Sequence, residues 1–179
     1  MAPNTKSQDF KTLYNLLPHS DYEEDQPLHH FILTQHVLHR GFQAGALIGL
    51  PIGLYRLYKP TSAQSLLPKP TILCRVAGQS ALIGTGLLTL GLVGRMFGRE
   101  DYEWRERSWR LLENKGQMRM DDYAVGGMAV GGVGALLGKN ALKGLGWKGA
   151  VGALALGDLG GTFLGFAIEG GNEHGMGKY

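Results

Sequence analysis

The chain has little of the chemistry that marks secreted proteins and cysteine-based sites. Only one of its 179 residues is a cysteine, Cys74, so it can form neither an intramolecular disulfide nor a cysteine-based zinc site. Residues 1–27 lack the apolar core of a secretory signal, and the acidic residues at 21, 23, 24 and 25 are unlike an arginine-rich mitochondrial presequence. We therefore expect any targeting information to lie in internal segments.

Catalytic and cofactor motifs are missing as well. Val133 and Asn140 break the phosphate-loop spacing around Gly138 and Lys139, and Ser80 lacks the second glycine of a nucleophile elbow. His36 and His39 are spaced i,i+3 and could share a metal ion, but no carboxylate within their helix completes a set, which favours hydrogen-bonded interfacial histidines. We expect no cofactor, no metal and no enzymatic activity of the chain's own.

The charge pattern argues against nucleic-acid binding. The net charge is +3 and the pI is about 9.0, but the arginines of residues 99–121 alternate with acids. Three acid–arginine pairs with i,i+4 spacing predict a solvated or interfacial helix over about 100–114, which Gly116 would end: Asp101–Arg105, Glu103–Arg107 and Glu106–Arg110.

What the chain has in abundance is glycine, at 29 residues. It recurs at every fourth position through apolar segments, which places it on one helix face, although an interior glycine costs about 1 kcal/mol relative to alanine in a soluble helix. In a bilayer such a face lets a neighbouring backbone approach closely. The predicted helix-packing positions are Gly41, Gly45, Gly49, Gly53, Gly127, Gly131, Gly149, Gly157, Gly161 and Gly165.

These segments predict an all-α integral membrane bundle of four glycine-rich (GxxxG) transmembrane helices. The spans are expected at about 41–58, 72–97, 123–138 and 147–168, within a membrane domain of residues 28–170. A polar arm (1–27) and an amphipathic lead-in helix precede the first span, the charged helix joins spans two and three, and a polar tail covers 171–179. The first and third spans are short for a bilayer, which needs about 20 residues.

A few polar residues stand out against this apolar background. Asp158 lies near the middle of the fourth span, where it requires either a role in proton or ion transfer or a hydrogen-bonding partner, for which Gln79 and Ser80 of the second span are candidates. Basic residues flank the two short loops and could hold an anionic lipid such as cardiolipin or simply set the topology: Arg56, Lys59, Arg75, Lys139 and Lys143.

One stretch carries a family resemblance. Basic residues, an Asp-Asp pair and a glycine-rich span, Lys115-Gly116-Gln117-Met118-Arg119-Met120-Asp121-Asp122-Tyr123-Ala124-Val125-Gly126-Gly127, are similar to the start of the third helix in the translocase-channel family of the mitochondrial inner membrane. With the histidine-rich lead-in, Leu-Tyr-Lys-Pro at 57–60 and Trp-Arg-Glu-Arg at 104–107, the chain resembles that family's branch of fungal-specific accessory membrane subunits of respiratory complex I.

The resemblance implies a non-catalytic subunit of the membrane arm of NADH:ubiquinone oxidoreductase in the mitochondrial inner membrane. Its partners would be other membrane-arm subunits and phospholipid, with the termini toward the intermembrane space and the short basic loops in the matrix. The charge of the two loops favours the same orientation. A preprotein translocase component and a small carrier of the same fold are the alternatives.

Overall fold

The computed structural model describes residues 17–138 and 144–176, without the side chains of 170–176. Regular structure within these ranges is entirely helical, as the sequence predicts: a short 3-10 turn, η2 (Glu23–Asp25), and five α-helices. These are α1 (His29–Tyr58), α2 (Lys69–Met96), α3 (Asp101–Glu113), α4 (Lys115–Leu137) and α5 (Gly146–Met176). Lys139 and Lys143, most of the N-terminal arm and the last three residues lie outside the described residues.

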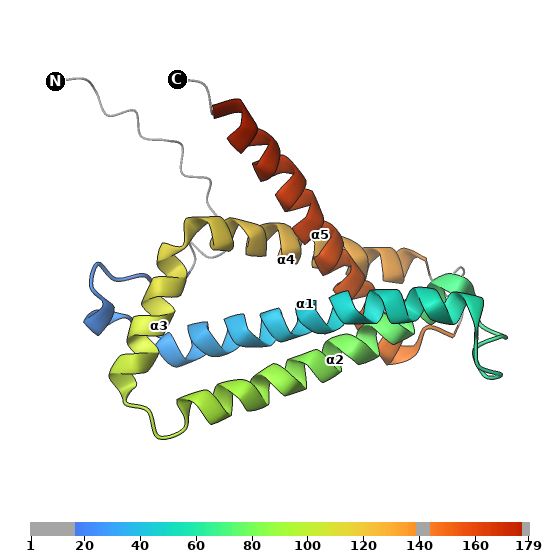
Figure 1. The fold of residues 1–179 in the computed structure, drawn as a ribbon, viewed down its shortest axis with the longest axis horizontal. Helices are drawn as coiled ribbons and strands as arrows, with labels where there is room; N and C mark the ends of the chain where they lie inside the picture. The colour runs from blue at the N-terminus through green and yellow to red at the C-terminus, as the bar shows by residue number, and fades with distance from the viewer. Residues whose placement is uncertain (1–16, 139–143, 177–179) are drawn as a thin grey trace.

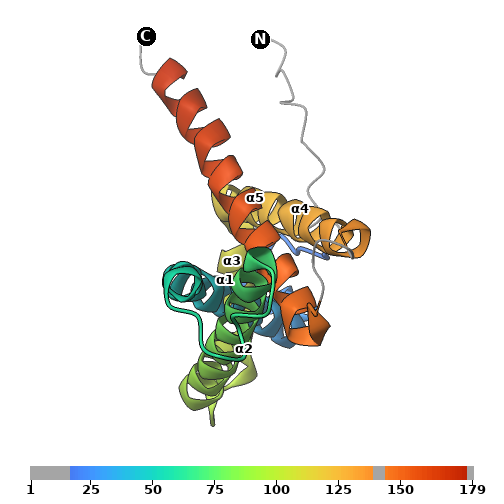
Figure 2. The same ribbon diagram turned by 90° about the vertical axis from the view of Figure 1, so that its right-hand side faces the viewer.

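Four long helices build the body of the molecule. In Figure 1, α1 and α2 run side by side, α4 lies on the other side of α1, and α5 crosses the group obliquely. The main packed pairs are α1 with α2, α4 with α5, and α2 with α5. Figure 2, turned by 90°, shows α5 passing from α2 toward α4, so this helix joins the two halves of the bundle.

Local sequence explains where these helices begin and end. Pro68 and Pro70 stand at the start of α2, where proline costs no helical hydrogen bond, and Pro51 lies inside α1 without ending it. The lead-in helix and the first predicted span are therefore one helix of 30 residues. The prediction that Gly116 ends the charged helix is wrong. That helix ends at Glu113, because the Asn114 side chain accepts from the Gln117 backbone N–H at 3.1 Å and caps α4.

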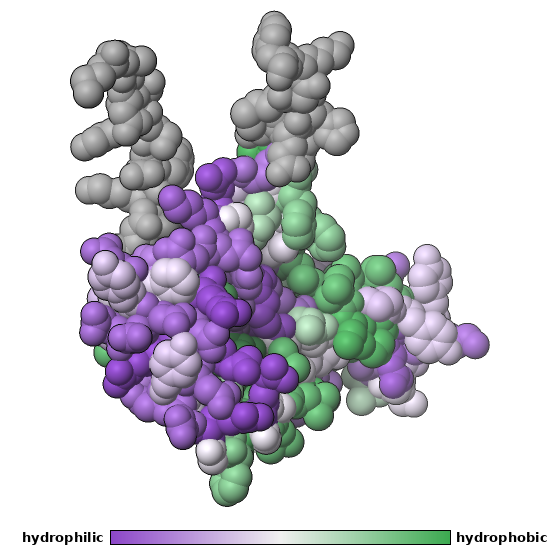
Figure 3. Space-filling model, turned by 60° about the vertical axis from the view of Figure 1, so that its left-hand side comes forward, coloured by the Kyte–Doolittle hydropathy of each residue, from purple (hydrophilic) through white to green (hydrophobic). Residues whose placement is uncertain are grey.

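Helix α3 closes one end of the bundle and has the predicted polar character. All three i,i+4 acid–arginine ion pairs form on it, with N···O distances of 2.7, 3.8 and 2.5 Å. The segment around η2 docks on α3, where the Tyr102 hydroxyl donates to Glu23 at 2.7 Å and the Trp109 indole donates to the Ser20 carbonyl at 3.1 Å. Figure 3 shows hydrophilic side chains gathered over this end and apolar ones beyond it.

Two described helices are long and apolar enough to cross a bilayer, α2 and the Gly146–Glu169 part of α5. The other two predicted spans do not meet that measure, for separate reasons. Helix α1 carries Arg40 and several histidines in its first half, and the apolar part of α4 begins only after Asp121 and Asp122. The predicted polar tail also begins inside a helix, because α5 continues to Met176.

Candidate functional site

The crossing of α1 and α2 brings two backbones together at glycine. A Cβ atom placed on Gly45 would lie 2.2 Å from the Ser80 carbonyl oxygen, and one on Gly41 would lie 2.8 Å from that of Gly84. Ordinary van der Waals contact for such an atom is 3.4–4 Å. A Cβ atom on Gly49 would lie 2.7 Å from the Ser80 side chain, and one on Gly53 would lie 2.7 Å from the Leu73 side chain. No side chain larger than hydrogen fits at Gly41 or Gly45 without the helices separating.

The crossing of α4 and α5 has the same character. A Cβ atom on Gly157 would lie 2.2 Å from the Gly127 carbonyl oxygen, and one on Gly161 would lie 2.0 Å from that of Tyr123. A Cβ atom on Gly131 would meet the Ala153 carbonyl oxygen at 2.2 Å. Such short approaches let Cα–H groups face carbonyl oxygens across the interface, where weak hydrogen bonds and dispersion favour the pairing.

The ladder of glycines expected on α5 is only part of its packing surface. Gly149 faces the side chain of Leu145, and Gly165 faces the ring of Tyr123, so neither opposes a partner backbone most closely. The contact between α2 and α5 uses Gly78 and Gly152 instead, two glycines that the every-fourth-residue pattern does not include. A Cβ atom on Gly152 would lie 1.6 Å from the Cys74 carbonyl oxygen, the tightest approach among the described glycines.

Beside these crossings lies a cluster of buried polar side chains, contributed by α1, α4 and α5. Asp158 of α5 is fully buried, with His39 Nε2 3.2 Å from its Oδ2 atom. Gln43 Nε2 donates to Asp158 Oδ1 at 2.9 Å and to the Thr162 hydroxyl at 3.1 Å. Gln43 also accepts from Arg40, which connects this group to a second one. Polar side chains on one face of α1 therefore supply the partners of the buried Asp158 carboxylate on α5.

The second group centres on Asp121 of α4, which is also fully buried. Arg40 donates to its Oδ1 atom, and His36 Nδ1 lies 3.3 Å from Oδ2. His36 Nε2 is in turn 2.8 Å from the Gln117 side-chain nitrogen. Arg40 thus pairs with Asp121 and bonds to Gln43, so the two carboxylates belong to one connected network.

The cluster holds more carboxylates than guanidinium groups. Two buried carboxylates face one guanidinium, and burying an uncompensated charge is expensive. On each carboxylate the Oδ2 atom faces an imidazole nitrogen without a well-aligned hydrogen bond among the described residues. Each buried acid therefore has a histidine of α1 beside it.

Several sequence expectations need correction against this geometry. Asp158 bonds to residues of α1, whereas Gln79 is exposed on α2 and Ser80 faces Gly49. A second acid, Asp121, just before the third predicted span, is also fully buried. For His36 and His39 the sequence favoured hydrogen bonding over a shared metal, and each lies beside a carboxylate, 3.3 Å from Asp121 and 3.2 Å from Asp158 respectively. Residues 36, 39, 40 and 43 share one polar face of α1. That pattern could have indicated acidic side chains on the helices packed against this face.

Three of the five basic residues proposed for lipid lie within the described part of the chain. Arg75 of α2 donates through Nε to the Leu145 carbonyl at 3.1 Å and through Nη2 to the Gly144 carbonyl, so it fastens the start of α5 to α2. Arg56 is half-buried at the end of α1, and Lys59 just beyond it is exposed. Lys139 and Lys143 lie outside the described residues. Arg75 thus has a structural contact, and Lys59 is open to solvent or lipid.

Two surface hollows, of about 460 and 470 Å³, lie along α1 and α3, and neither is lined by a residue of the buried cluster. Compared with known protein families the chain matches no family model, and it matches no curated protein. Its function must therefore be argued from its own residues.

Proposed function

We propose that this chain is a non-catalytic accessory subunit in the membrane arm of mitochondrial NADH:ubiquinone oxidoreductase, complex I. The observation that carries the proposal is the set of helix crossings at which glycine lets two backbones touch, as at Gly152 on Cys74 and Gly161 on Tyr123. This packing suits a bilayer, where apolar side chains gain little by leaving lipid and close backbone approach is the available driving force. The sequence resemblance supplies the identity of the complex.

The outward faces of the helices support a role in an assembly. Large apolar side chains are exposed along both candidate spans, including Leu87, Leu90 and Val93 on α2 and Phe163 and Phe166 on α5. Similar side chains project from α1 and α4, such as Ile48 and Val133, and favour all four long helices crossing the inner membrane. Lipid tails and the helices of neighbouring subunits would cover these surfaces.

In this role the polar end of the molecule docks outside the bilayer. Helix α3 and the η2 segment would lie with the termini on the intermembrane-space side, and the two short loops would lie in the matrix. Exposed Lys59 and half-buried Arg56, near the Arg75 anchor, would meet anionic headgroups such as those of cardiolipin there.

A proton-coupled carrier of the same fold is the second candidate, and the buried cluster is the specific observation in its favour. Its two carboxylates and two histidines lie close together inside the bundle, the kind of arrangement that transport relays use. A preprotein translocase would need a hydrophilic groove along its spans. Asp121 and Asp158 are fully buried and line no groove, which disfavours that alternative.

The deciding experiment is native electrophoresis of mildly solubilised mitochondrial membranes, with an in-gel stain for NADH oxidation and detection of this chain. We expect the chain to migrate with the NADH-oxidising band. Gly161→Leu should reduce the amount in that band, whereas Gly160→Leu, where an added Cβ atom meets nothing within 4 Å, should fold and insert normally. Migration in a smaller, unstained assembly would refute the complex I assignment.

The carrier candidate makes an opposite prediction for Asp158→Asn. A carrier would lose transport while the chain still assembled, because the proton-holding carboxylate is gone. An accessory subunit would keep both assembly and electron transfer nearly unchanged, since asparagine can still accept from Gln43.

A further inference from the structure

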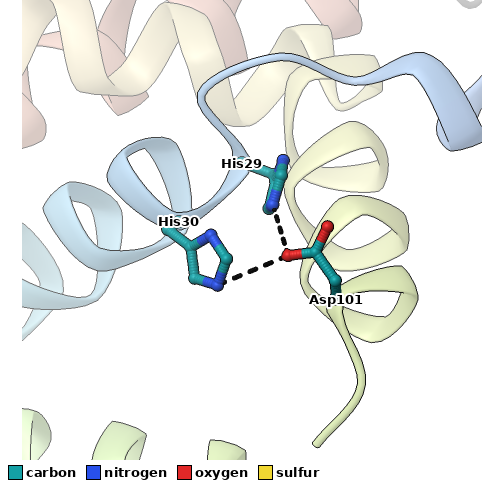
Figure 4. Close-up of side chains that lie close together, drawn as sticks. All are labelled: His29, His30 and Asp101. Atoms are coloured by element: carbon teal, nitrogen blue, oxygen red, sulfur yellow. Dashed lines mark hydrogen bonds and ion pairs between the residues drawn. The ribbon is translucent and has the colours of Figure 1, made fainter.

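Two histidines and one aspartate meet on the exposed polar end of the molecule, away from the buried cluster. His29 and His30 begin α1, and Asp101 begins α3, so residues 72 positions apart in the chain converge there. One donor atom from each of the three lies within 4.8 Å of the others. Figure 4 shows both imidazole rings directed at the same carboxylate.

We propose that His29, His30 and Asp101 form a binding site for a divalent transition-metal ion of the zinc type, which joins the first turn of α1 to the first turn of α3. Imidazole and carboxylate are the ligands that such ions accept, and three protein ligands leave a position open for water. The site is independent of the complex I assignment, because it rests on three side chains outside the helix crossings.

The spacing of the donor atoms fits such an ion. His29 Nε2 lies 2.9 Å from Asp101 Oδ1, and His30 Nε2 lies 3.7 Å from the same oxygen. Ligand atoms about 2.0–2.1 Å from a tetrahedral zinc ion stand about 3.3 Å apart. The two observed separations fall on either side of that value, so small side-chain rotations bring the donors into place.

Hydrogen bonding at His29 gives a second, independent reason. Its Nδ1 atom lies 2.9 Å from the Gln26 carbonyl oxygen, and its Nε2 atom lies 2.9 Å from the Asp101 carboxylate. Both neighbours are acceptors, but a neutral imidazole carries only one N–H. When the single N–H is on Nδ1 and donates to Gln26, the Nε2 lone pair faces the Asp101 carboxylate, and a cation between the two would satisfy both atoms. The Nδ1–H···O=C bond is the usual orienting contact behind a metal-bound histidine.

The other two side chains are also held from behind. Arg105 donates to Asp101 Oδ2 at 2.7 Å, which leaves Oδ1 to face both imidazoles. The His30 ring packs on Trp104, with ring centroids 4.5 Å apart. Gln26 is 2% exposed, and its side chain donates to the Pro18 and Pro27 carbonyls. These bonds fix the turn that holds the Gln26 backbone carbonyl beside His29 Nδ1. The surroundings therefore orient the donors before any ion arrives.

The site remains open to solvent on one side. The His30 side chain is 57% exposed and that of Asp101 is 49% exposed, so an ion can enter and keep bound water. The η2 segment docks on the same helix α3, where Tyr102 donates to the Glu23 carboxylate and Arg105 donates to the Glu24 backbone carbonyl. A bound ion would lock the docked η2 segment, α1 and α3 together.

The test uses the full chain, purified in detergent with an affinity tag that contains no histidine and stripped with a chelator. Zn²⁺ is titrated in competition with a chromogenic chelator, and the bound metal is counted after equilibrium dialysis. We expect one zinc per chain, and His30→Ala and Asp101→Asn should each weaken binding about tenfold or more. His30 is largely exposed, so its replacement leaves the fold in place, which far-UV circular dichroism checks.

The matched control is His19→Ala, because His19 also stands beside a carboxylate, 3.4 Å from Glu113, but belongs to no group of three ligands among the described residues. It should bind zinc as the unmodified chain does. Substitution by Co²⁺ should give visible absorption bands of a low-coordinate nitrogen–oxygen site that vanish in His30→Ala. Equal affinity in all the variants, or well below one zinc per unmodified chain, would overturn the proposal and leave His29 hydrogen-bonded to Asp101 with no ion between them.

Discussion

Replacing Gly152 with alanine perturbs the tightest helix contact of the bundle by a single methyl group. The added Cβ atom would lie 1.6 Å from the Cys74 carbonyl oxygen, 2.5 Å from its carbonyl carbon and 2.9 Å from the Gly78 nitrogen. All three atoms belong to backbone, so no side-chain rotation relieves the overlap. Helices α2 and α5 must move apart.

The magnitude follows from that movement. Restoring ordinary contact, which begins at 3.4 Å, requires the backbones to separate by nearly 2 Å at this point. A gap of 0.5–1 Å already forfeits about a quarter to a half of each dispersion contact, and overpacking a core costs about 1–3 kcal/mol. Alanine also favours the helix by about 1 kcal/mol over glycine. Gly160→Ala on the same helix gains that propensity without overlap, since nothing lies within 4 Å of its Cβ position.

The propensity gain is common to both variants, so they should differ by the overpacking cost, about 1–3 kcal/mol in the free energy of unfolding, or about 2–12 °C in melting temperature for a chain of this size. Thermal unfolding in detergent, followed by circular dichroism, measures the difference. Cys74 provides a local readout, because it is the only cysteine, is 8% exposed and lies at the contact itself. Its maleimide labelling should accelerate in Gly152→Ala and stay slow in Gly160→Ala. Equal melting temperatures and equal labelling rates would refute the packing argument.

Other substitutions test the polar contacts. Asp121→Asn should destabilise the chain by about 2–4 kcal/mol in detergent unfolding, because it leaves Arg40 without its buried anion. Asp158→Asn should cost about 1 kcal/mol or less. A larger loss for Asp158→Asn than for Asp121→Asn would contradict the importance given to the Arg40–Asp121 ion pair. The hydrogen bond from His29, with Arg105 adding to it, lowers the pKa of Asp101 below its usual 3.8, so its stabilisation is present above that pH and is lost as the pH falls through the folded-state value. Asp101→Asn should therefore flatten the acid side of the pH–stability curve, and an unchanged acid slope would argue against the bond. The hydrogen bond to Glu23 raises the pKa of Tyr102 above 10.0, so its stabilisation is complete below pH 10 and is lost as the pH rises through the folded-state value. Tyr102→Phe should remove that alkaline decline, which a melting series from pH 9 to 11 would reveal.

Local sequence was sufficient wherever the cause lies within a few residues. Proline and the polar run at 99–121 placed the loop after Tyr58 and the charged helix, and i,i+4 spacing gave the ion pairs of α3. The end of that helix was predicted to within one residue, but its cause was not, because Asn114 ends one helix and caps the next and Gly116 lies inside α4. Apolar composition marked α2 and the first part of α5 as able to cross a bilayer.

The sequence could predict that some polar residues need partners, but it could not predict which residues pair. Sequence showed that Asp158 needs a partner and that α1 carries histidines, but the pairing of Asp158 with His39 and of Asp121 with Arg40 joins residues 119 and 81 positions apart. Nothing in a linear pattern selects among distant donors, and the nearer candidate Gln79 proved to face outward. The meeting of His29 and Asp101 is of the same kind, since it depends on how α3 closes against the start of α1.

The sequence by itself determined that this chain is helical, that glycine faces and apolar runs dominate it, and that its charge is concentrated at one end, because helix period and burial preference are encoded residue by residue. Only the tertiary structure decided which glycine meets which backbone. Gly152 opposes Cys74 and Gly161 opposes Tyr123, while Gly160 opposes nothing, although all three glycines lie on the same helix. The angle and register at which two helices cross select these contacts, and they depend on the packing of the whole bundle at once.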